Sequence, residues 1–319
     1  MAKSKKSGGK KPKTNQSVKE EKLLDNDKKV DKKTVGKKTV KNTNKAGKDK
    51  AEKVESKPEV KTEKKAGFWK KFFSKKYTEN ENILTIFKEK KTYGALLGEI
   101  FGTMFITMLI LTLGLYQLLY LLLIFIVVIV AVHRLSGANL NPIATVGMMA
   151  TRRISAIRGI LYLLAQVVGA WIGLMIVKAF LVASGSEVEL PGMTATPDGM
   201  FWAVSMIEFF GAAIIGFFFC RAQQYRHSSL TFAAVVSGGT VLALILAYII
   251  TANYFALDGT FILNPAVALM YQILPQTANG VGELLGGIGL ALTTYVVFPM
   301  VGGVVGFYLS DVAETLVEE

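Results

Sequence analysis

The chain has 319 residues, of which 51% are hydrophobic, and it carries a formal net charge of +13 with a single cysteine. The lone Cys220 excludes an intrachain disulfide and a cysteine-based metal site. No motif predicts a catalytic centre, a cofactor or a metal site, so we do not expect an enzyme.

Positive charge is concentrated at the start of the chain. Residues 1–92 contain 30 of the 37 lysines and arginines but 13 of the 24 acidic residues, so they carry a net charge of +17 and the remainder carries −4. Residues 1–66 have too few apolar side chains to offset the entropy of ordering, and we expect a disordered Lys-rich cytoplasmic tail. Anionic lipid headgroups would attract this tail, whereas nucleic acid is the less favoured partner.

Residues 67–92 form a second segment, in which aromatic side chains recur between lysines at helical spacing. This amphipathic pattern suits a helix lying in the membrane interface, or a short helix packed on the cytoplasmic side of the membrane-spanning part. No apolar stretch with a cleavage site precedes it, so we expect the first spanning segment to act as its own insertion signal. The aromatic residues are Phe68, Trp69, Phe72, Phe73 and Tyr77.

Residues 93–319 are expected to form an all-α integral membrane protein. Six apolar stretches reach the roughly 20 residues that a helix needs to cross a bilayer. They fall at roughly 94–113, 117–135, 158–181, 201–221, 230–252 and 284–310.

Basic residues predict the orientation of these spans. Arg152 and Arg153 lie in one connection and Arg226 lies in another, whereas segments 183–200 and 253–283 contain neither Lys nor Arg. Because cytoplasmic loops are enriched in basic residues, the connections with arginine and the tail belong in the cytoplasm. Six spans then place both termini on that side, and we expect the protein in the plasma membrane.

Two Asn-Pro dipeptides each predict the start of a short helix. Asn is a strong helix N-cap and Pro is favoured at the first helical position, so helices should begin at Asn141-Pro142 and Asn264-Pro265. About nine or ten residues follow before Thr151 in one case and before Pro275 in the other, which is half a span. Two half-helices in corresponding places predict a pore or transport site at the membrane midplane.

The two halves of the chain carry related motifs in the same order. Glu-Ile-Phe-Gly begins at residue 99 and Glu-Phe-Phe-Gly begins at residue 208. Each half has three spans, so the halves cross the membrane in opposite senses and their half-helices meet near the midplane. We expect Glu99 and Glu208 to accept hydrogen bonds from N–H groups of the loop before each half-helix, with a proton relay as the alternative.

The N-termini of the half-helices define the expected chemistry. Each carries about half a positive charge, so two facing termini oppose the passage of cations. Asn141 and Asn264 would present amide donors, and carbonyl groups of the preceding extended residues would line the path. Uncharged donors and acceptors suit water and small neutral solutes.

With these motifs the chain resembles the major intrinsic protein family, the aquaporins and glycerol facilitators, over about residues 93–310. The resemblance implies six spanning helices and two half-helices around a pore in each protomer of a homotetramer, with passive conduction. The residues at the pore midplane would be Asn141, Pro142, Asn264, Pro265 and Ala266. The other matching positions are Glu99, Glu208, Ser136-Gly137-Ala138, Ala165-Gln166, Gly169-Ala170 and Phe298-Pro299.

Departures from the family bear on the solute. Asn139 stands where the family usually has His, Ile143 follows the first Asn-Pro in place of Ala, and Val267 stands where the family usually has Arg. Counted by offset from the two motifs, the outer constriction of the pore falls on Leu121, Ala252, Phe261 and Val267, with position 252 placed only to within a residue. A constriction made of these four residues has neither a fixed charge nor a side-chain donor.

We predict a passive channel for small neutral solutes that favours glycerol and related polyols, with water as a co-permeant. One alternative is a water channel with a dry hydrophobic gate at Leu121, Phe261 and Val267. A proton-coupled transporter using Glu99 and Glu208 is a second alternative. A membrane-anchored binding protein that works through its Lys-rich tail is a third.

Overall fold

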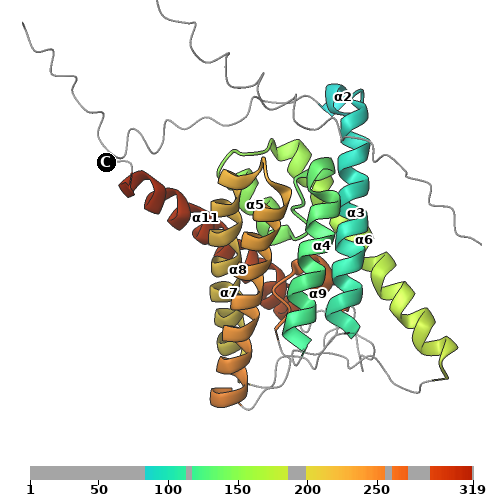
Figure 1. Ribbon diagram of the computed structural model, residues 1–319. Helices are drawn as coiled ribbons and strands as arrows, with labels where there is room; N and C mark the ends of the chain where they lie inside the picture. The colour runs from blue at the N-terminus through green and yellow to red at the C-terminus, as the bar shows by residue number, and fades with distance from the viewer. Residues whose placement is uncertain (1–82, 113–116, 186–198, 256–260, 272–287, 318–319) are drawn as a thin grey trace, which may run out of the picture. The chain divides into compact units, whose positions relative to one another are not determined.

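The computed structural model of the chain divides into two units, Met1–Glu63 and Lys64–Glu319. It describes residues 83–112, 117–185, 199–255, 261–271 and 288–317, all of which belong to the second unit (Figure 1). The predicted tail and the aromatic residues at 68–77 lie outside the described residues, so the interpretation of both stays a prediction.

The regular structure of the described residues is helical, with no strand among them. Within these ranges, six helices are long and apolar enough to cross a membrane, which confirms the predicted all-α fold class. Two of these spans include a π-helical turn, η3 (Thr251–Phe255) at the end of the fifth and η4 (Thr293–Val297) inside the sixth, which covers Ile288–Val317. The main α-helices of the six spans are α3 (Lys90–Thr112), α4 (Leu118–Ser136), α6 (Ala156–Ala183), α7 (Phe201–Ala222), α8 (Ser229–Ile250) and α11 (Phe298–Val317).

Helix ends differ from the apolar stretches by a few residues, because hydropathy marks the part of a helix suited to lipid and not the point where the helix stops. The first span begins at Lys90, within the segment 67–92, after a short helix α2 (Ile83–Ile86). Capping groups set other ends: Ser155 accepts a hydrogen bond from the N–H of Arg158 at the start of α6. At the end of α4, Gly137 has a φ of 85°, the left-handed conformation that favours glycine.

Two short helices begin at the predicted prolines. They are α5 (Pro142–Ala150), with nine residues, and α9 (Pro265–Tyr271), with seven residues up to the edge of the described range. The side chain of Asn141 accepts a hydrogen bond from the N–H of Ile143, and the side chain of Asn264 accepts one from the N–H of Ala266. Both helices therefore start where local capping chemistry places them, and α5 has half the length of a span.

Glycines of the predicted repeat allow close contact between helices. A methyl group added at Gly169 of α6 would meet the backbone carbonyl of Ile100, the residue after Glu99. In the second half, a methyl group added at Gly302 of α11 would meet the carbonyl of Phe209, the residue after Glu208. Equivalent glycines thus pack α6 against α3 and α11 against α7, as expected where small residues let helices approach.

The half-helices join the two halves of the chain. The first, α5, packs against α11 and α7 of the second half, and α9 packs against α6 of the first half. α4 also packs against α8, so both halves contribute helices to one core. Because each half-helix packs on the opposite half of the chain, the N-terminal ends of α5 and α9 lie against each other.

Candidate pore at the meeting point of two half-helices

The two Asn-Pro motifs contact each other through a reciprocal pair of hydrogen bonds. The amide nitrogen of Asn141 donates to the carbonyl of Leu263 at 2.8 Å, and the amide nitrogen of Asn264 donates to the carbonyl of Leu140 at 3.4 Å. Each amide also caps its own half-helix through its oxygen. The N-termini of α5 and α9 are therefore fixed beside each other, although the two asparagines are 123 positions apart in the sequence.

The loops before the half-helices adopt a backbone that non-glycine residues seldom take. Ala138, Leu140 and Leu263 have φ angles of 53°, 52° and 53°. A left-handed conformation costs a non-glycine residue about 1–2 kcal/mol. Since these loops are buried, their N–H groups also need partners within the protein.

Two buried carboxyl groups supply those partners. Glu99 accepts hydrogen bonds from the N–H groups of Asn139 at 3.0 Å and Leu140 at 2.8 Å. Glu208 accepts them from Ile262 at 2.6 Å and from Leu263 at 3.2 and 3.3 Å. Both carboxyl groups are fully buried. Their hydrogen bonds satisfy the N–H groups of the loops and thereby offset the cost of the left-handed conformation.

The first loop has further support that the sequence did not predict in detail. The amide nitrogen of Gln166 donates to Glu99 at 2.7 Å and to the hydroxyl of Thr145 at 2.8 Å. The amide of Asn139 donates to the same hydroxyl at 3.4 Å. The sequence signal for this network is a glutamine inside an apolar span, because a buried amide needs hydrogen-bond partners. In the second half of the repeat, Pro299 occupies the position that matches Gln166. Proline has no side-chain amide, so the glutamine network is specific to the first half.

A cavity of about 50 Å³ borders the two asparagines. One water needs about 10–15 Å³ by this measure, so the cavity has room for a few water molecules or part of a small solute. The loops contribute residues 138–141 and 262–264, among them Asn139, Asn141 and Asn264. Helices α3, α4, α7 and α8 contribute mainly Ile, Phe, Val and Leu residues. The lining is thus amphipathic and uncharged.

Comparison with known proteins identifies the family. The sequence profile of the major intrinsic protein family matches residues 86–310. The chain belongs to the major intrinsic protein family. Glycerol uptake facilitator protein-like 6 of Lactiplantibacillus plantarum is 30% identical over 183 residues, 56% of this chain and 75% of that protein. Aquaporin-1 of Sus scrofa is 34% identical over 86 residues, 27% of this chain and 30% of that protein.

A solved structure shares the fold. The X-ray structure of the aquaglyceroporin from Plasmodium falciparum superposes with a TM-score of 0.53 at 20% sequence identity, covering 69% of this chain and 96% of that chain. The chain is therefore a multi-pass membrane protein with the fold of a channel family.

The four residues of the predicted outer constriction lie in different surroundings. Leu121 and Phe261 belong to the apolar cluster that surrounds the cavity, and Ala252 lies half-buried in η3. Val267, at the usual position of the family's arginine, is fully buried in a separate cluster with Val204 and Tyr295. Among the described residues, the lining of the cavity beside Asn141 and Asn264 includes none of these four residues. Their assignment to a constriction stays a prediction.

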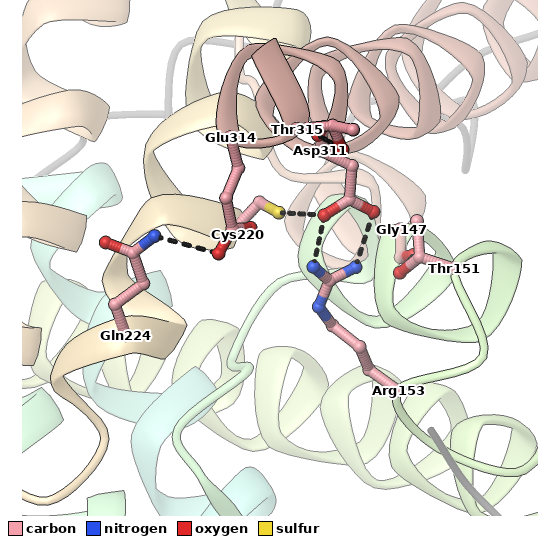
Figure 2. A network of polar contacts seen from close by, with 8 residues as sticks. All are labelled: Gly147, Thr151, Arg153, Cys220, Gln224, Asp311, Glu314 and Thr315. Atoms are coloured by element: carbon pink, nitrogen blue, oxygen red, sulfur yellow. Dashed lines mark hydrogen bonds and ion pairs between the residues drawn. The ribbon is translucent and has the colours of Figure 1, made fainter. Parts of the chain in front are cut away.

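At its other end, α5 is held by a buried ion pair. Figure 2 shows the guanidinium of Arg153 facing the carboxylate of Asp311 on α11, with nitrogen–oxygen distances of 3.1 and 2.6 Å. The thiol of Cys220 also donates to Asp311 at 3.7 Å. Tyr308 of α11 donates to the carbonyl of Ala150 at 3.0 Å. The sequence indicates only the orientation of the segment with Arg153, because the ion-pair partner of this residue lies 158 positions away.

Proposed function

We propose that the protein is a passive channel for small neutral solutes, favouring glycerol and related polyols, with water as a co-permeant. The observation that carries this proposal is the pair of crossed asparagine amides at the N-termini of α5 and α9, on the border of an uncharged, amphipathic cavity. Two helix N-termini disfavour cations at this point. The carbon face of a polyol suits the apolar helices, and its hydroxyl groups suit the asparagines and loop carbonyls.

The carboxyl groups favour a channel over a proton-coupled transporter. Glu99 and Glu208 accept hydrogen bonds from loop N–H groups with both of their oxygens. A proton carrier would have to break these bonds in each cycle and release the strained loops. We therefore propose that both act as loop supports.

A water channel with a hydrophobic gate is the second candidate. Leu121 and Phe261 both lie in the apolar cluster around the cavity, which favours such a gate. Without a charged donor at Val267, selectivity would depend on size and apolar contact. This candidate differs from the first in one measurable property, the permeability to glycerol.

The assembly and placement of the protein are also proposed here. Family resemblance supports a homotetramer in the plasma membrane, and the basic residues support cytoplasmic termini. The sequence supports a Lys-rich tail at 1–66, an amphipathic segment at 67–92 and a channel domain at 93–319, with the tail on anionic lipid headgroups. We assign no enzymatic activity and no cofactor.

Stopped-flow light scattering of vesicles that contain the purified full chain tests the proposal. Water, glycerol and urea gradients are applied in turn, with protein-free vesicles as the control. We expect glycerol and water fluxes above the control that do not saturate and do not depend on a proton gradient. Water flux without glycerol flux would favour the gated water channel, and dependence on a proton gradient would favour a carrier.

A further inference from the structure

The cavity wall has two chemically distinct parts. The loops before the half-helices contribute three asparagines and their neighbours in the chain. The helices bring side chains that are almost all apolar. A solute that crosses this point must therefore place each of its hydroxyl groups against a polar group or leave that group unpaired, which costs free energy.

The apolar part follows the internal repeat. Helix α3 contributes Ile106 and Ile110, seven and eleven residues after Glu99. Helix α7 contributes Ile215 and Phe219, at the same intervals after Glu208. Equivalent positions thus supply equivalent apolar surface from the two halves.

Helix α8 breaks this pattern. Its contribution is Val236, Thr240 and Leu244, which are four residues apart and so lie on one face of the helix. The corresponding contribution of α4 is Phe125 and Ile129, both apolar. Within the described residues, Thr240 is the polar side chain that a spanning helix adds to the cavity.

The hydroxyl of Thr240 has a defined direction. It donates its proton to the carbonyl of Val236 at 2.9 Å, one turn earlier in α8. A hydroxyl group has one donor and two acceptor sites, so the oxygen keeps the capacity to accept. The amides of Asn141 and Asn264 are donors, and their hydrogen bonds already engage the carbonyls of Leu263 and Leu140. Beside the groups of its loops, the cavity therefore has a side-chain acceptor on α8.

We propose that Thr240 is a specificity-determining residue of the channel, whose hydroxyl oxygen accepts a hydrogen bond from one hydroxyl of a polyol while an asparagine amide donates to another. This inference rests on the proposed function and names the solute class of the same site, small molecules with at least two hydroxyl groups. Water depends less on Thr240, because a water molecule finds a neighbouring water as partner. The carbon chain of glycerol excludes such a neighbour.

The test compares glycerol and water permeabilities of the full chain and its variants in vesicles. Thr240→Val keeps the shape of the side chain and removes the hydroxyl. We expect the glycerol-to-water ratio to fall by about 3- to 10-fold, the effect of one hydrogen bond. Thr240→Ser keeps the hydroxyl and should retain the ratio of the unaltered chain.

Thr107→Val is the matched control. Thr107 is a buried residue of α3 that donates to the carbonyl of Thr103 at 2.8 Å in the same way, but it is not among the residues that line the cavity. Its substitution should leave the ratio unchanged. All fluxes are normalised to the amount of protein in the vesicles.

Two outcomes would overturn the inference. One is an unchanged glycerol-to-water ratio in Thr240→Val, whether both fluxes are retained or both fall equally. The other is a Thr240→Ser variant that behaves like Thr240→Val. Absence of glycerol flux in the unaltered chain would instead refute the proposed function itself, and with it the role of Thr240.

Discussion

The ion pair between Arg153 and Asp311 predicts a large effect on stability. The side chains of these residues are 10% and 6% exposed, and the carboxylate accepts two hydrogen bonds from the guanidinium. Asp311→Ala leaves the guanidinium buried without this carboxylate, and removing one partner of a buried pair costs about 3–5 kcal/mol. We expect the free energy of unfolding to fall by that amount.

Denaturant unfolding in detergent, followed by helical circular dichroism, measures this effect. A double variant, Arg153→Met with Asp311→Leu, removes both charges and should recover most of the lost stability. The control is Glu314→Gln, because Glu314 accepts from Gln224 at an exposed site at 3.3 Å. That substitution should change the free energy of unfolding by less than about 0.5 kcal/mol.

The same variants test whether the ion pair positions the half-helix. Arg153 follows the C-terminal end of α5, so we expect Asp311→Ala to reduce solute flux per folded protein as well. In the unfolding measurement, a fall of less than about 1 kcal/mol in the free energy of unfolding of Asp311→Ala would refute the assignment of a buried ion pair. Surface ion pairs contribute in that range, so water would then reach the pair.

Three further predictions concern the midplane, the outer mouth and the tail. Asn141→Asp or Asn264→Asp places a carboxylate at the paired helix N-termini, and we expect a cation leak or a blocked pore in ion-flux assays; unchanged solute and cation flux in both would contradict a shared site. Val267→Arg should lower the glycerol-to-water ratio several-fold, by the loss of room and apolar contact, and a ratio that stays or rises would place Val267 outside the constriction. A peptide of residues 1–92 should bind anionic vesicles and dissociate at high salt, because charge attraction decays within about 8 Å at physiological ionic strength; equal binding to neutral vesicles would contradict this.

The sequence alone determined the features that depend on neighbouring residues. Span length follows from runs of apolar residues, and the starts of α5 and α9 follow from an asparagine cap and a proline at the first position. The repeat of Glu99 and Glu208 was visible because each lies in an otherwise apolar span. These signals are local, so one sequence was enough to predict them.

Tertiary structure decided which distant residues meet. The crossed amides of Asn141 and Asn264, and the ion pair of Arg153 with Asp311, join positions more than 100 residues apart. Thr240 lines the cavity because α8 turns that face inward, and the composition of an apolar span does not indicate which face that will be. Val267 is fully buried in a cluster with Val204 and Tyr295, and its offset from the Asn-Pro motif does not indicate these neighbours. Offsets along the chain specify position in a helix, whereas the packing of neighbouring helices decides what each side chain contacts.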